Sequence, residues 1–124
     1  MTVKAFLTIN AVLAVLYGVA FVLFPGASLA IFGVASEPHV NLNLQFFGSA
    51  LLALGVILWF AKDFRDWEAV RGVLIGSVVA DAVGLLINLW GTFQGLTNAM
   101  AWTSSLVYVL LLAGSLYFLS KGQL

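Results

Sequence analysis

Residues 69–92 read AVRGVLIGSVVADAVGLLINLWGT, an apolar stretch with one ionisable side chain far from its ends, that of Asp81. A helix rises about 1.5 Å per residue, so this stretch is long enough to cross the hydrocarbon core of a bilayer, which is about 30 Å thick. We therefore expect a transmembrane helix here, with Asp81 near its middle.

Two stripes of residues follow this segment at helical spacing. A ridge of small residues recurs every four positions and consists of Gly72, Gly76, Ala80 and Gly84. The neighbouring stripe is mostly polar and consists of Ser77, Asp81, Gly84 and Asn88. Small residues let membrane helices approach closely, and polar side chains hydrogen-bond between helices. We expect both stripes to face other helices, which makes this the central helix.

The rest of the chain is also strongly apolar. Of its 124 residues, 63% are hydrophobic and 8% are charged, whereas a soluble domain has about 45–50% and about 25%. A soluble fold of this size could not cover so much apolar surface, so we expect an integral membrane protein whose main partner is the lipid bilayer. The formal net charge of zero gives no electrostatic reason to expect nucleic acid as a partner.

Several residue types that build reactive sites are missing. The chain has no cysteine, which excludes disulfides, thiolate metal ligands and thiol nucleophiles. Its single histidine, His39, cannot supply two axial haem ligands, and no cluster of residues has metal-ligand spacing. We therefore expect no metal site and no cofactor.

Four segments are long and apolar enough to span a membrane, namely residues 3–24, 42–61, 69–92 and 98–120. The first is longer than a signal-peptide core, so we expect it to remain as a span. Short connections make consecutive helices antiparallel neighbours. We expect one transmembrane domain over residues 1–124, an all-α four-helix bundle with up-down-up-down topology. Residues 25–41 form the longest connection and should lie at the outer interface, and Gly48 and Gly55 should mark the packing face of the second span.

The basic residues orient this bundle. With four spans they all fall on one side of the membrane: Lys4, Lys62, Arg65, Arg71 and Lys121. The positive-inside rule makes that side cytoplasmic, so we expect both termini in the cytoplasm.

Asp81 is the leading candidate for a functional residue. A charged side chain at the centre of a bilayer costs at least about 2.5–3.5 kcal/mol, so it needs a proton, a partner or water. Counted along the helices from their charged ends, polar groups of all four spans lie at similar depths of about 16–21 Å, namely Asp81, Ser49, Tyr108 and Tyr17. Gln45, Asn88 and Thr103 lie farther out and predict a polar track from Asp81 towards the outer face. The cytoplasmic half has fewer polar groups, mainly Ser77, Asn10 and Thr8.

Three roles are open for this polar site. Hydrogen bonds from Ser and Tyr to a buried Asp81 can fix the register of the helices and do nothing else. The site can instead bind a ligand or a partner, or it can move protons or ions.

Several phrases of the chain carry a family resemblance. They are Tyr17-Gly18 followed by FPGASLAIFG at 24–33, QFFGSALLALGVILW at 45–59, and Asp81 followed by Gly84. Over most of its length the chain resembles small bacterial four-helix membrane proteins of the DoxX-like type. The resemblance implies a four-helix fold in the bacterial cytoplasmic membrane and little biochemistry. Related sequences carry an arginine near the start of the second span, where this chain has Gln45, so an anion-binding role is not carried over.

The sequence favours a non-enzymatic binding or accessory protein, in which the polar site around Asp81 holds a lipid-like ligand or docks a helix of a larger membrane complex. The alternative is a transporter, acting as a homo-oligomer, that uses Asp81 as its titrating group. A weaker alternative is an enzyme that acts on a lipid or isoprenoid, with Asp81 and Tyr108 as the acid/base pair.

Overall fold

The computed structural model describes residues 1–124 and contains five helices and no strands. Four helices are long and apolar enough to cross a membrane: α1 (Val3–Leu23), α3 (Pro38–Ala61), α4 (Trp67–Phe93) and α5 (Ala101–Lys121). The fifth, α2 (Pro25–Ile31), is a short helix between α1 and α3. The all-helical fold with four candidate spans is as predicted, and the protein is a multi-pass membrane protein.

The ends of the helices follow from local chemistry. The Thr2 hydroxyl accepts a hydrogen bond from the backbone N–H of Ala5 (3.1 Å) and so caps α1. A proline cannot continue a helix, and Pro25 ends α1 and opens α2. α3 begins at Pro38, four residues before the predicted start of the second span, because proline is well suited to the first turn of a helix.

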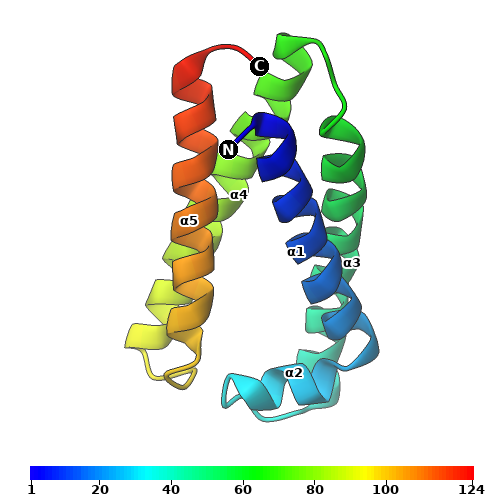
Figure 1. Ribbon diagram of the computed structural model, residues 1–124. Helices are drawn as coiled ribbons and strands as arrows, with labels where there is room; N and C mark the ends of the chain where they lie inside the picture. Colours follow the sequence, from blue (N-terminus) through cyan, green and yellow to red (C-terminus); the bar gives the residue numbers. More distant parts are fainter.

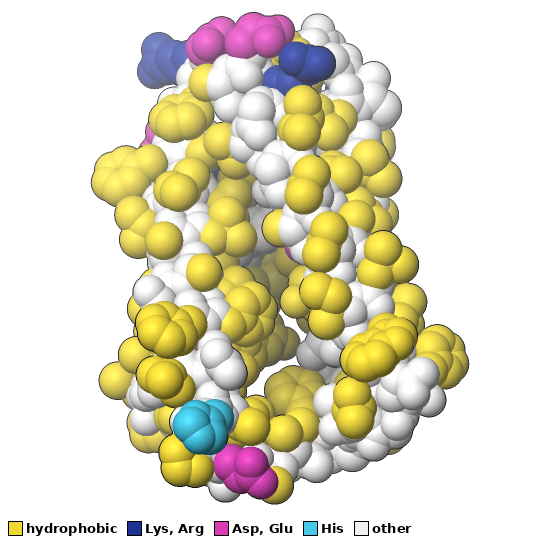
Figure 2. Space-filling view, turned by 180° about the vertical axis from the view of Figure 1, so that it is seen from behind, with side chains coloured by type: hydrophobic (Ala, Val, Ile, Leu, Met, Phe, Trp, Pro, Cys, Tyr) yellow, Lys and Arg dark blue, Asp and Glu magenta, His cyan; other side chains and the backbone are white.

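The helices are arranged as two antiparallel pairs (Figure 1). α1 packs along α3, and α4 packs along α5, whereas contacts between the two pairs are sparse. The two pairs approach each other at the end that holds both termini and diverge towards the opposite end, where α2 lies across the base. Figure 2 shows Lys and Arg side chains gathered at the end that holds the termini.

The apolar core lies at this end of the molecule. Three leucines from three helices, Leu7, Leu58 and Leu74, are fully buried there. Phe6 of α1 packs on Phe118 of α5 with ring centroids 5.3 Å apart, and the absence of a side chain at Gly114 makes room for the Phe6 ring. The core therefore joins the two helix pairs at one end only.

Glycines hold α1 against α3. A Cβ atom added to Gly18 would lie 2.9 Å from the carbonyl oxygen of Gly48, and one added to Gly55 would lie 2.6 Å from a methyl carbon of Val15. The prediction that Gly48 and Gly55 mark the packing face of the second span is therefore confirmed. Nε2 of Gln45 donates a further hydrogen bond to the carbonyl oxygen of Val22 (3.0 Å) across the same pair.

The small-residue ridge of α4 does not face other helices of this chain as predicted. Gly72, Gly76 and Ala80 are exposed, and a Cβ at Gly72 or Gly76 would meet no atom within 4 Å. Steps of four residues turn a helix by about 400°, so each member is displaced by about 40° from the one before it. The ridge therefore drifts around the helix, and only Gly84 reaches the inner face, where it lies against Tyr108.

The loop between α4 and α5 contacts the end of α2, at the end of the molecule opposite the termini. Nδ2 of Asn98, before α5, donates to the carbonyl oxygen of Ile31 (2.9 Å), and its backbone N–H donates to the carbonyl oxygen of Phe32 (2.9 Å). Gly33 next to it has a φ of 72°, which glycine adopts readily. We call these two hydrogen bonds the Asn98 latch. It bridges the open end of the diverging pairs.

An ion-pair cluster closes the opposite end. The carboxylate of Asp63, in the α3–α4 loop, lies 2.6 Å from Nζ of Lys62 and 2.9 Å from Nζ of Lys4. Hydrogen bonds from Lys62 and Lys4 lower the pKa of Asp63 from 3.8 to about 2. The cluster ties the start of α1 to this loop.

Candidate functional site

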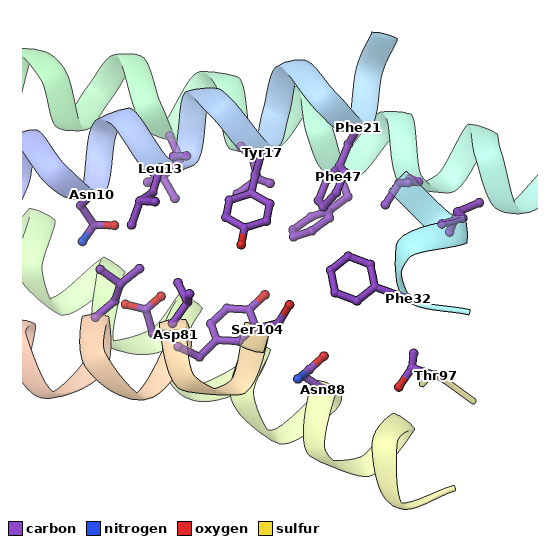
Figure 3. Close-up of a pocket in the computed structure, with 18 of the residues that line it drawn as sticks. Asn10, Leu13, Tyr17, Phe21, Phe32, Phe47, Asp81, Asn88, Thr97 and Ser104 are labelled. Atoms are coloured by element: carbon purple, nitrogen blue, oxygen red, sulfur yellow. The ribbon is translucent and has the colours of Figure 1, made fainter. Parts of the chain in front are cut away.

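A cavity of about 300 Å³ lies between the two helix pairs, beyond the apolar core. Figure 2 shows it as a deep hollow between two columns of hydrophobic side chains, and Figure 3 shows the residues that line it. The lining is largely apolar and includes Leu13, Ala14, Phe21, Leu29, Phe32, Val34, Leu44, Phe47, Leu51, Leu54, Val107 and Leu111. The cavity follows directly from the fold, because the pairs diverge where the core ends.

Asp81 and Asn10 lie at one end of the cavity, on opposite sides (Figure 3). Their exposed fractions are 8% and 5%, so both side chains are buried within the protein. Neither Oδ2 of Asp81 nor Nδ2 of Asn10 has a hydrogen-bond partner. Buried polar atoms are nearly always hydrogen-bonded, so an unpaired acceptor and an unpaired donor at one end of a cavity are unusual.

The helical repeat explains why these two side chains point inward. Asp81 shares a buried face of α4 with Leu74 and Ser77, and Asn10 shares a buried face of α1 with Leu7 and Ala14. Residues three or four apart lie on the same side of a helix. Each face begins at a leucine in the core, and Asn10 and Asp81 lie where it reaches the cavity.

Asn88 presents an acceptor to the cavity. Its Nδ2 donates to the carbonyl oxygen of Ala101 (2.9 Å) and to Oγ of Ser105 (2.7 Å), which fastens α4 to α5. An amide nitrogen has two hydrogens, so both donors are used. The remaining group, Oδ1, is directed towards the cavity in Figure 3.

Two tyrosines, Tyr17 and Tyr108, line the cavity from opposite pairs. The hydroxyl group of Tyr17 points into the cavity in Figure 3. The ring of Tyr108 lies against Gly84, where an added Cβ would be 2.5 Å from the ring. The absence of a side chain at Gly84 therefore makes room for Tyr108 in the cavity wall.

The predicted polar track towards the outer face has different members from those expected. Asn88, Ser104 and Thr97 line the cavity on the way to its outer end, and Oγ1 of Thr97 has no partner. Gln45 does not line it, because its amide is bound to α1. Thr103 is exposed and donates to the carbonyl oxygen of Met100 (2.6 Å).

Two further predicted residues lie outside the cavity. Ser49 is exposed on α3, because the adjacent Gly48 faces α1 and the next residue is turned by about 100° from it. Ser77 is buried, one turn before Asp81, but does not line the cavity. Depth along a helix, on which these predictions were based, says nothing about its rotation.

Asn10 belongs to the site, although it was predicted on the cytoplasmic side, apart from the polar site. By residue count it lies much nearer to the charged end of its helix than Asp81 does. The helices are inclined to one another (Figure 1), so equal counts do not give equal heights. A usable signal was present, because Leu7, Asn10 and Ala14 follow helical spacing and an asparagine among apolar residues in a span calls for a partner.

The wall of the cavity has an acidic residue and no basic residue. Asp81 is the only acidic residue in the lining, and no Lys, Arg or His lines the cavity. The basic side chains lie at the end that holds the termini, and Lys4 and Lys62 there are paired with Asp63. The cavity can therefore accept hydrogen bonds from a bound group or balance its positive charge, but it offers no cation to an anion.

Comparisons of the chain with protein-family models, with curated proteins and with solved structures give no match.

Proposed function

We propose that this protein binds a small amphipathic, lipid-like molecule in the cavity between its two helix pairs. One observation carries this proposal: Oδ2 of Asp81 and Nδ2 of Asn10 are buried without partners at the end of an otherwise largely apolar cavity. Both side chains line the cavity, so an amphipathic occupant would bind the carboxyl of Asp81 and the amide of Asn10 with its polar head and fill the apolar part with its tail.

Unpaired polar groups at the end of the cavity are energetically unfavourable. Leaving a buried donor or acceptor unpaired costs about 1–3 kcal/mol, and more for a charged group. Water could solvate the polar end of the cavity, but most of the cavity wall is apolar and would gain nothing from water. A ligand with a polar head and an apolar tail satisfies both parts of the wall, which is the usual composition of a small-molecule site.

The position of the cavity supports a lipid-like ligand. The cavity is only partly enclosed, and the helix pairs that flank it carry exposed apolar side chains such as Phe46, Leu86 and Leu106. In a bilayer those side chains contact acyl chains. A ligand could therefore enter sideways from the membrane without first crossing water.

We place both termini in the cytoplasm and the protein in the bacterial cytoplasmic membrane. The support is the positive-inside rule, since the basic residues gather at the end that holds the termini. The cavity then lies in the outer half of the membrane.

Binding is better supported than transport or catalysis. Movement of a solute or proton to the other side would need a path through the core around Leu7, Leu58 and Leu74, whose side chains are fully buried. An enzyme would need a second group that acts with the carboxyl of Asp81. Asp81 and Tyr108, the expected pair, both line the cavity, but no hydrogen bond joins them.

The direct test is to purify the protein from its native membrane in a mild detergent and weigh it by native mass spectrometry. We expect a bound molecule of a few hundred daltons, roughly the size of one lipid-like ligand. Ser104→Trp fills the cavity and should abolish this adduct. Ser49→Trp, which adds the same side chain to the exposed side of α3, should keep it. An absent adduct in the wild type, or equal adducts in both variants, contradicts the proposal.

A further inference from the structure

We propose that the ligand of this cavity is a lipophilic amine, bound through its positively charged head by Asp81. This inference rests on the proposed function and adds the chemical class of the ligand. It is drawn from the charges and hydrogen-bonding groups that the cavity wall presents.

The charge of the wall selects against anions. Asp81 carries the one carboxyl group in the lining and has no basic partner there. Asn10, on the opposite side, offers amide donors but no charge. A ligand carboxylate or phosphate would meet a carboxyl group and no cation, whereas an ammonium head would let Asp81 carry its charge at low cost in hydrocarbon.

The hydrogen-bonding groups of the wall fit a donor head. Oδ2 of Asp81 is an unpaired acceptor, and the free group of Asn88 is its carbonyl Oδ1, because both amide hydrogens are already donated to Ala101 and Ser105. An ammonium group has three donors and no acceptor. It complements the carboxyl of Asp81 better than a carbonyl or ether head, and Oδ1 of Asn88 adds a further acceptor towards the outer end of the wall.

The aromatic side chains add a second feature that favours a cation. Tyr17 and Tyr108 line the cavity from opposite pairs, and Phe21 and Phe47 stack with centroids 5.6 Å apart in the same wall. The face of an aromatic ring attracts an ammonium group, and the attraction grows where water is excluded. The same rings also pack against an apolar tail.

The test uses three probes with one chain and different heads: decylamine, decanol and decanoate. The protein is held in nanodiscs of zwitterionic lipid at pH 7, where an alkyl amine is protonated, and saturable binding is measured by titration. We expect decylamine to bind at least about tenfold more tightly than decanol, as one charge-assisted hydrogen bond provides, and decanoate to bind most weakly.

Asp81→Asn keeps the size of the side chain and removes its charge. It should weaken decylamine binding by about tenfold or more and leave decanol binding unchanged. Ser49→Asn, on the exposed side of α3, is the matched control and should change neither. Melting temperatures of all variants show whether each remains folded.

The outcomes separate the two proposals. Saturable binding of decanol or decanoate that equals or exceeds that of decylamine overturns the amine assignment and leaves the binding function standing. Equal loss of decylamine and decanol in Asp81→Asn also overturns it. No saturable binding of any probe by the folded wild type contradicts both proposals.

Discussion

Nδ2 of Asn10 on α1 and Oδ2 of Asp81 on α4 are buried on opposite sides of one end of the cavity, and neither atom has a hydrogen-bond partner. The donor belongs to one helix pair and the acceptor to the other. The pairs touch at the core near the termini and at the Asn98 latch, and between these points they are held apart. A ligand that binds both side chains would therefore also join the two helix pairs.

Replacing Asp81 by leucine should stabilise the ligand-free protein. An unpaired carboxyl group in an apolar surrounding is unfavourable, and leucine removes it at similar size, so we expect the free energy of unfolding to rise by about 1–3 kcal/mol. Unfolding in mixed micelles with increasing dodecyl sulfate measures this. A clear decrease in stability would show that Asp81 is paired in the membrane, contrary to the structure.

Asn88→Leu should have the opposite effect. Asn88 joins α4 to α5 through two hydrogen bonds of 2.9 and 2.7 Å, and hydrogen bonds between membrane helices contribute about 0.6 kcal/mol each, up to about 1.7. We expect a loss of about 1–2 kcal/mol in the same unfolding assay. An unchanged or increased stability would mean that these hydrogen bonds do not hold the pair together.

Leucine substitutions at two glycines of α4 should affect stability differently on its inner and outer faces. At Gly84 a Cβ would lie 2.5 Å from the ring of Tyr108, so Gly84→Leu should cost about 1–3 kcal/mol by overpacking and reduce the cavity. At Gly76 nothing lies within 4 Å, so Gly76→Leu should change the stability of the monomer by less than about 0.5 kcal/mol. Similar losses at both positions would show that α4 is rotated from its place in the structure.

Removing the side-chain half of the latch should loosen the base of the cavity. Asn98→Ala deletes the 2.9 Å hydrogen bond from Nδ2 to the carbonyl oxygen of Ile31. We expect faster amide hydrogen exchange in α2 and at Gly33, with little change in the core around Leu58. Exchange that stays the same at α2, or that rises equally at Leu58, would contradict a local role for the latch.

The pKa of Asp63 gives a test at the charged end. Because Lys62 and Lys4 lower this pKa to about 2, the ion pairs stabilise the fold above the ordinary value of 3.8, and the contribution is lost as the pH falls towards 2. Carbon NMR of the labelled carboxyl should show this titration midpoint at low salt. High salt should move it upwards, because the group is exposed and its ion pairs are screened. A midpoint near 3.8 at low salt would show that the cluster does not form.

The class of fold could be predicted from the sequence, and the rotation of the helices could not. Length and hydropathy suffice for a span such as residues 69–92, because the bilayer sets the length of a helix that crosses it. Ser49 and the ridge at Gly72 and Gly76 were assigned to inner faces by their spacing or depth, and they lie outside. In lipid the apolar face of a helix does not reveal which side is buried, since both sides are apolar.

Asp81 could be found from the sequence because the rest of its span is apolar. An acid within a span is costly enough to indicate the protein interior, and it lines the cavity. Its neighbours Tyr17, Tyr108 and Asn88 were also expected. Asn10 was placed apart from them, because the inclination of α1 and α4 is a property of the packed helices. The volume of the cavity likewise depends on how far the two pairs diverge, which no single helix determines.

The most direct test of a ligand-binding cavity is an experimental density map of the wild-type protein, prepared from its native membrane and held in a lipid nanodisc. We predict elongated density between the two helix pairs, with its polar end within hydrogen-bonding distance of the carboxyl group of Asp81 and beside the side-chain amide of Asn10. A collapsed space, in which Asn10 and Asp81 bind each other directly and no density lies between the pairs, would contradict the account.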